Sequence, residues 1–317
     1  MIIGSALEPL LTRYAAWLGM DYEGVLVDRD EDPDQVRAIQ IILRLERGTP
    51  PSWHAALALA ASGCAALCLD PRSEPGGEWH EAVSAYCRGH IRKVTRRGRG
   101  AQWEATADLP GITLAHGRAG DTTEVRVLLP GLVTEVDRSV AKLQVGGTDI
   151  PEDEYPVIAA APEPRETTGP DGPEALASSH APADPELVAG SEVPPDSGDD
   201  AASPTSDGES ALLTVKVPEE GPAAAMTAGK LMAQAGHAGM IAAALLAASD
   251  QEALAAWRAA GCPCRVTRVP APQWNALLEE VRDPARGWSE HRLLAVRDAG
   301  FTEVAPGTVT VVARFTR

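Results

Sequence analysis

Three polar side chains recur within one apolar stretch, MTAGKLMAQAGHAGMIAAAL, which spans residues 226–245. Lys230, Gln234 and His237 follow one another at intervals of four and three residues, so a helix places all three on one face. Lys230 stands in the first turn after Thr227, a suitable N-cap, where a cation opposes the positive end of the helix dipole. The placement becomes favourable if an anion binds there, because backbone N–H groups and an ammonium then converge on one phosphate.

Each of these residues also has an ordinary structural explanation. Lys230 fits an exposed, solvated face, and Gln234 fits a surface or capping position. His237, which follows Gly and precedes Ala, fits a hydrogen-bonded histidine of the core. The spacing alone leaves both explanations open.

A second group of chemically capable residues lies in VRDAGFTEVAPGTVTVVA, residues 296–313. Asp298 ends a strand and is followed by Ala-Gly, a tight turn in which only small residues fit. Thr302 comes four residues later, and Pro-Gly turns the chain again before Thr308 opens the last strand. A carboxylate so placed can orient or activate water, but Asp298 equally fits a turn-capping role.

The net charge of −17 is unevenly distributed along the chain. Residues 151–210 hold fifteen acidic side chains and one basic side chain, which gives −14, whereas 1–150 and 211–317 carry −4 and +1. Because the two ends are close to neutral, the total charge does not exclude a nucleic-acid partner. The acidic segment is rich in Pro, Ala, Ser and Gly, so we predict a disordered linker at 151–210 between domains at 1–150 and 211–317. A plain tether and an acidic recognition segment are both open roles for it.

The sequence predicts a cytoplasmic protein with no membrane partner. The N-terminus lacks a basic flank followed by an apolar core, which a secretory signal requires. The longest apolar run, residues 54–69, is too short and interrupted to cross a bilayer. The five cysteines lie in or beside apolar segments, as in a reduced compartment.

Apolar periodicity predicts an α/β fold of two small three-layer domains, each with a mixed four-stranded sheet. In the C-terminal domain we expect strands at 211–217, 264–269, 291–300 and 307–315, and helices at 227–248, 249–261 and 270–283. In the N-terminal domain we expect strands at 38–46, 111–116 and 123–130, and helices at 50–69, 77–97 and 133–147. A strand followed by an Ala-rich helix occurs in both, which indicates an old duplication.

The two motifs, taken in order with the elements between them, resemble the type-2 peptidyl-tRNA hydrolase family. That family's pattern runs K-G-K-x-A-A-Q-x-x-H-A and then D-A-G-x-T-x-x-x-P-G-[ST]-x-T, and residues 211–317 carry the resemblance. It implies a small mixed-sheet α/β domain. It also implies hydrolysis of the ester between a nascent peptide and the ribose at the 3′ end of tRNA, with peptidyl-tRNA as the partner.

The resemblance assigns roles position by position. Asp298 would orient or activate water, with Thr302, and Lys230 with Gln234 would stabilise the oxyanion or hold the terminal phosphate. His237 would fix the helix, with general-base catalysis as the alternative. Two further positions match substrate-binding residues: Thr308 follows Pro-Gly, and Arg265 stands where the family usually has a strand lysine.

Several positions depart from the family pattern, and the family's Gly-Pro ending is replaced by RFTR. Thr227 lies near the place of the first motif lysine, and Glu219 is the nearest substitute for an acid after the first strand. Phe301 and Glu303 flank Thr302 where the family often has a basic residue and Gln.

The N-terminal half is interpreted as a degenerate, non-catalytic copy, since its Ala-rich helix lacks the lysine and no D-A-G-x-T follows. It contains the most basic stretch, RGHIRKVTRRGRGAQW, residues 88–103. Arg92, Lys93, Arg96 and Arg97 in this stretch are candidate tRNA-backbone contacts, with Trp103 for stacking. A solvated helix end is the alternative.

Three functions remain in competition: a peptidyl-tRNA hydrolase, a non-catalytic tRNA-binding or regulatory protein with the same fold, and a scaffold whose halves pack as a pseudo-dimer. The sequence leaves open whether the halves form an intramolecular pseudo-dimer or the chain forms a homodimer. No cofactor or metal is required by the expected chemistry. The pair His80-Glu81 lacks the second histidine of a zinc-protease motif, and GCPC at 261–264 lacks the spacing of a metal site.

Overall fold

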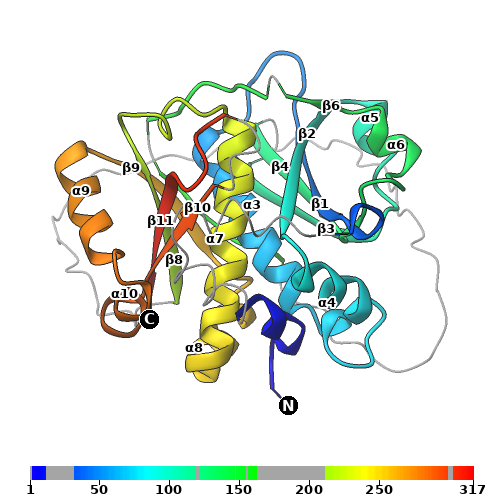
Figure 1. Ribbon diagram of the computed structural model, residues 1–317. Coiled ribbons are helices and arrows are strands. Elements are labelled where there is room, and N and C mark those ends of the chain that lie inside the picture. The colour runs from blue at the N-terminus through cyan, green and yellow to red at the C-terminus, as the bar shows by residue number, and fades with distance from the viewer. Residues whose placement is uncertain are drawn as a thin grey trace, which may run out of the picture.

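The computed structural model describes residues 2–11, 32–118, 121–146, 148–154, 156–162, 211–298 and 303–317. These residues form two mixed sheets (Figure 1). Sheet A contains β1 Arg37–Arg44, β2 Arg92–Gly98, β3 Gly111–Arg118, β4 Asp121–Leu128, β5 Gly131–Leu132 and β6 Gln144–Val145. Sheet B contains β7 Ile158–Ala159, β8 Leu212–Pro218, β9 Cys264–Val269, β10 Leu293–Arg297 and β11 Val309–Thr316. The predicted α/β class is confirmed, and each sheet has short strands beyond the four expected.

The two sheets share one topology. Sheet A has the order β3-β4-β1-β2-β6 and sheet B the order β10-β11-β8-β9-β7. In each sheet the first two long strands of the chain pair in parallel, and every other pairing is antiparallel. A parallel pair needs a long crossover, and each crossover contains one Ala-rich helix. The matching order supports the interpretation that one half arose as a copy of the other.

The two crossover helices, α3 Trp53–Leu69 and α7 Ala228–Ser249, pack against each other between the two sheets (Figure 1). Helix α3 also contacts β9, and α7 also contacts β2, so each helix touches the sheet of the other half. A helix that is apolar all round must be buried all round. Helix α7 is long and apolar enough to cross a membrane, but 78% of its apolar window is buried inside the protein, as in a core helix.

Small residues let the two helices approach closely. A Cβ atom on Gly239 of α7 would lie 2.2 Å from the carbonyl oxygen of Ala61 in α3, and one on Gly236 would lie 2.9 Å from Cys64 Sγ. No side chain fits at the first of these positions without moving a backbone. The Ala-rich composition of both helices therefore follows from their central place.

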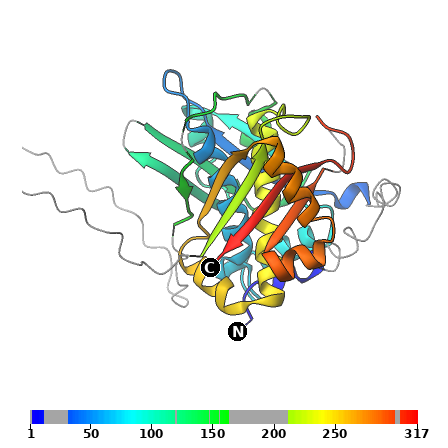
Figure 2. The same cartoon turned by 90° about the vertical axis from the view of Figure 1, so that its left-hand side faces the viewer.

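Further helices cover the outer faces of the sheets and the ends of the helix pair. Figure 2 shows α9 Ala271–Glu280 and α10 Pro284–His291 over the strands of sheet B, where Leu277 and Val281 pack on Leu293 and Val312. On sheet A, Trp103, Val140 and Leu143 pack on Ile42 and Leu128. The remaining helices are α4 His80–Arg88, α5 Ala101–Glu104, α6 Arg138–Ala141, α8 Gln251–Ala259 and the short 3-10 turns Ser5–Leu7, Pro33–Gln35 and Pro71–Ser73.

Two predicted helices of the N-terminal half were wrong in extent. The helix predicted at 77–97 ends at Arg88, and residues 92–98 form β2, paired in parallel with β1. Gly89 ends the helix, and the β-branched pair Val94-Thr95 continues as a strand. In the region 133–147 only α6 is helical, and β6 follows it.

The first part of the predicted linker is ordered. Ile158 and Ala159 pair with β9, and the Ala161 N–H donates to the Gly261 carbonyl at 2.7 Å. Ala159 and Ala161 are buried, so this apolar part of the segment adds an edge strand to sheet B. The rest of the predicted linker, 163–210, lies outside the described residues.

We expect Gly239→Ala to lower the free energy of unfolding by about 2 kcal/mol or more, because its methyl group must displace the α3 backbone. Chemical denaturation would measure this. Gly131→Ala is the matched control, since nothing lies within 4 Å of its added Cβ. Equal stability of the two variants would contradict the close helix contact.

Candidate active site

A cavity of about 550 Å³ lies between the two halves, at the N-terminal end of α7. The C-terminal half contributes Thr227, Gly229, Lys230, Ala233, Gln234, His237, Ile241, residues 295–298 and Glu303. The N-terminal half contributes Leu10, residues 90–95, Val145, Gly146 and Thr148. Both sequence motifs therefore open into one space, and β2 forms the opposite wall.

An ion pair between Lys230 and Asp298 is the central polar contact of the cavity. The Lys230 ammonium contacts Asp298 Oδ2, and the side chains are 15% and 4% exposed. The Asp298 backbone is fixed as well, because its N–H donates to Thr308 at 2.9 Å and its carbonyl accepts from Gly307 at 2.7 Å. Removing one member of a buried pair leaves an uncompensated charge, so the two side chains depend on each other.

Gln234 and Thr310 hold the Asp298 carboxylate in place through a chain of hydrogen bonds. Gln234 Nε2 donates to Asp298 Oδ2 at 2.7 Å, and the Thr310 hydroxyl donates to Gln234 Oε1 at 2.8 Å. The threonine thereby fixes the amide so that its NH₂ faces the carboxylate. Thr310 is buried and was missed from the sequence, although it matches the last threonine of the family pattern P-G-[ST]-x-T.

The first turn of α7 is tied to both halves. The Thr227 hydroxyl accepts from the Lys230 N–H at 3.3 Å, as predicted for an N-cap. The Glu303 carboxylate accepts from the Thr227 N–H and hydroxyl, both at 2.9 Å. From the N-terminal half, the Thr148 carbonyl accepts from the Gly229 N–H at 3.0 Å. Glu303 therefore joins the turn before β11 to the helix that carries Lys230.

His237 faces a lysine of the other half. Its Nδ1 lies 3.2 Å from Lys93 Nζ, and the ammonium donates to Nδ1. Burial, together with the positive charges of Lys93 and Lys230, holds the pKa of His237 well below its usual value. The ring is therefore neutral at pH 7 but a weak proton acceptor, and its Nδ1 already faces Lys93, which fits the predicted structural role.

Lys93 points inward rather than to the surface. Besides His237, its Nζ contacts the Tyr86 hydroxyl at 3.3 Å, the Ile91 carbonyl at 3.3 Å and Met240 Sδ at 3.2 Å. Alternation along β2 turns this side chain toward α7 and into the cavity lining, so Lys93 stays a predicted tRNA contact, now facing the cavity.

The other predicted substrate-binding residues are dispersed. Arg92 lines the cavity. Arg96 donates to Gln40 at 2.7 Å and Arg97 to Gln144 at 2.8 Å, both within sheet A. Two further predicted residues are outside the described lining of the cavity, Arg265 on β9 and Thr308. The Thr308 hydroxyl donates to the Ala305 carbonyl at 2.7 Å. Thr302 lies outside the described residues.

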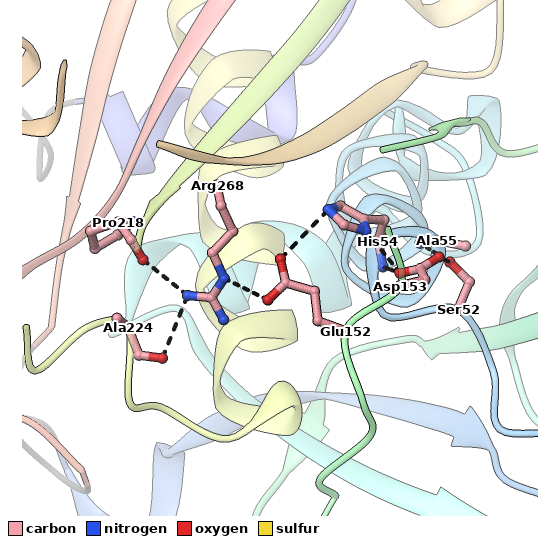
Figure 3. Close-up of polar contacts among 8 residues, drawn as sticks. All are labelled: Ser52, His54, Ala55, Glu152, Asp153, Pro218, Ala224 and Arg268. Atoms are coloured by element: carbon pink, nitrogen blue, oxygen red, sulfur yellow. Dashed lines mark hydrogen bonds and ion pairs between the residues drawn. The ribbon is translucent and has the colours of Figure 1, made fainter. Parts of the chain in front are cut away.

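The N-terminal end of α3 corresponds to the end of α7 that lines the cavity. It is occupied by the carboxylates of Glu152 and Asp153 (Figure 3). Asp153 accepts from the Ser52 hydroxyl, from the His54 N–H at 3.0 Å and from His54 Nδ1 at 2.8 Å. These bonds outweigh the effect of burial and hold the pKa of Asp153 below its usual value. In a hydrolytic triad the histidine lies between the serine and the acid. Here the acid lies between the other two, so the cluster is a helix cap.

A salt bridge beside this cap joins the two halves (Figure 3). Arg268 on β9 donates to Glu152 Oε2 at 2.8 Å and to the Pro218 carbonyl at 2.9 Å. Its guanidinium also lies 4.9 Å from the centre of the Trp53 ring. Residues 148–154 thus contact the first turns of both α3 and α7.

The site is thus a small α/β unit with a buried ammonium–carboxylate pair at one wall of a cavity. Residues 223–315 match the family model described as Peptidyl-tRNA hydrolase PTH2, the family that the sequence motifs resemble. No curated protein and no solved structure matches the chain. Within the described part of the chain, no group of three or more His, Cys, Asp or Glu side chains is placed to hold a metal ion.

The low pKa of His237 predicts a loss of stability in mild acid. Below pH 6.5 the unfolded chain binds a proton at this histidine that the folded chain does not, so the free energy of unfolding falls as the pH falls. His237→Gln should remove that component, which approaches about 1.4 kcal/mol per pH unit. Urea unfolding at several pH values measures it.

His291→Gln, at an exposed histidine, is the control for this comparison. It should leave the dependence on pH as in the wild type. If His237→Gln and wild type lose stability in parallel between pH 6.5 and 5, His237 is not held neutral.

Proposed function

We propose that this protein hydrolyses the ester bond of peptidyl-tRNA and so releases the peptide and free tRNA. The observation that carries the proposal is the buried Lys230–Asp298 pair of the family-matched segment, which Gln234 and Thr310 support and which lines a cavity. Peptidyl-tRNA is the substrate to which the family's description refers. The proposed place of action is the cytoplasm, and the five buried free cysteines are compatible with a reducing compartment.

The residues suit the chemistry of an activated ester. Attack of water on the ester carbonyl places negative charge on oxygen, and the Lys230 ammonium is the cation beside the Asp298 carboxylate. Asp298 is proposed to orient the water and accept its proton. As the bond between the acyl carbon and the ribose oxygen breaks, Asp298 passes the proton to that oxygen, and because water attacks directly no covalent intermediate is needed.

Other residues are proposed to support these two. Gln234 and Thr310 fix the rotamer of Asp298, and the neutral His237 packs α7 against β2. Thr302 is proposed to assist Asp298 in holding the water. Thr308 and Arg265 are kept as candidates for binding more distant parts of tRNA, and Arg92 as one for the tRNA backbone.

The decisive experiment measures release of a labelled N-blocked aminoacyl group from tRNA. Asp298→Asn and Lys230→Met should each lower kcat/KM at least tenfold, which corresponds to about 1.4 kcal/mol of barrier. Lys216→Met is the matched control, since Lys216 lies on β8 outside the described cavity lining. It should retain wild-type activity.

Thermal melts of the same variants would check that each one folds. A wild-type protein that binds tRNA in a salt-dependent way but releases nothing would instead support the non-catalytic, tRNA-binding function.

A further inference from the structure

The N-terminal half contributes an ammonium group to the cavity without a counter-ion among the described residues. The four partners of Lys93 Nζ are a hydroxyl, a carbonyl, a thioether and a neutral imidazole. Within the part of the chain that the structure describes, no carboxylate lies within 4.0 Å of it. Lys93 is partly buried, and burial lowers the pKa of its amine, because an ammonium taken out of water is costly unless it is paired. The position of Lys93 is therefore explained if a bound anion supplies the missing counter-ion.

The rest of the cavity also favours an anion. Its described lining contains the cations Arg92, Lys93, Lys230 and Arg297 against the two acids Asp298 and Glu303. The chain as a whole carries −17. A locally positive cavity in an acidic protein selects for a negatively charged ligand group.

Two hydroxyl groups on the same wall have no hydrogen-bond partner among the residues that the structure describes. Thr95 on β2 and Thr148 are 9% and 1% exposed, and their Oγ1 atoms make no hydrogen bond. Both residues line the cavity beside the first turn of α7. Buried hydroxyls normally have a partner, and rotation about χ1 presents a threonine hydroxyl to a neighbouring group. Ribose hydroxyls and phosphate oxygens are suitable partners.

We infer that the active site is shared between the halves, and that Lys93, with Thr95 and Thr148, binds the phosphate and ribose of the 3′-terminal nucleotide of tRNA. This inference rests on the proposed function for the identity of its ligand. It assigns the catalytic pair to the C-terminal half and nucleotide binding to β2 and residue 148 of the N-terminal half. The apolar part of the wall, including Ile91 and Val94, faces the base.

The test uses binding, so that it does not depend on turnover. The full-length Asp298→Asn protein is titrated with the trinucleotide C-C-A, the 3′ end of tRNA, and separately with adenosine. Lys93→Met in that background should weaken trinucleotide binding at least tenfold and leave adenosine binding within twofold. It should also reduce the slope of log K against log salt by about 0.7, the contribution of one phosphate contact on a single strand.

Matched controls separate this role from a structural one. Lys142→Met changes an exposed lysine of the same half, and Thr267→Val changes a strand threonine outside the described cavity lining. Neither should alter binding, whereas Thr95→Val and Thr148→Val should each weaken it several-fold. Lys93→Met should melt at or above the temperature of the parent protein, because it replaces an unpaired buried charge with an apolar chain of similar length.

The outcomes distinguish this inference from the proposed function. Equal trinucleotide affinity with and without Lys93→Met, or no trinucleotide binding at all, would overturn the shared site even if the enzyme hydrolyses its substrate. Binding that depends on Lys93 would support the inference even if no hydrolysis is seen. Where hydrolysis is seen, Lys93→Met should raise KM and leave kcat unchanged.

Discussion

The contact between α3 and α7 determines the arrangement of the whole molecule. The Gly239 position allows the backbones of the two helices to touch, and the two sheets then enclose the pair from opposite sides. Neither helix retains a solvated stripe, so both must consist of small and apolar residues. The same packing brings β2 of one half against the first turns of the helix of the other half.

That arrangement creates the environment of the Lys230–Asp298 pair. Sheet A covers the end of α7, so the pair lies in a cavity with few exposed polar groups. Electrostatic interactions are stronger in such surroundings than in water. The Thr310–Gln234–Asp298 chain then holds the carboxylate in one orientation, which prepares it before any ligand arrives.

Much of the C-terminal half could be predicted from the sequence because its information is local. Helical spacing put Lys230 and Gln234 on one face, and the turn signals placed Asp298 at a strand end; the structure brings all three together. The burial of Thr310 could have been inferred in one further step, from its place within the apolar strand β11.

The N-terminal contribution could not be found in this way. A run with two pairs of basic residues, RKVTRR, fits a solvated helix as well as a strand, and only pairing with β1 decides between them. The contact of Lys93 with His237 joins residues that are 144 positions apart. Such a contact depends on how two folded halves meet, which neither local periodicity nor the family pattern contains.

The covalent connection between the two like halves has an evolutionary consequence. In a symmetric homodimer every substitution appears at both equivalent places. Here each half carries its own residues, so the end of α7 has Lys230 beside Asp298 while the end of α3 is closed by Ser52, His54 and Asp153. One gene can thus keep the Lys230–Asp298 pair in one half and let the other half diverge into the opposite wall of the cavity, an asymmetry that identical subunits cannot evolve.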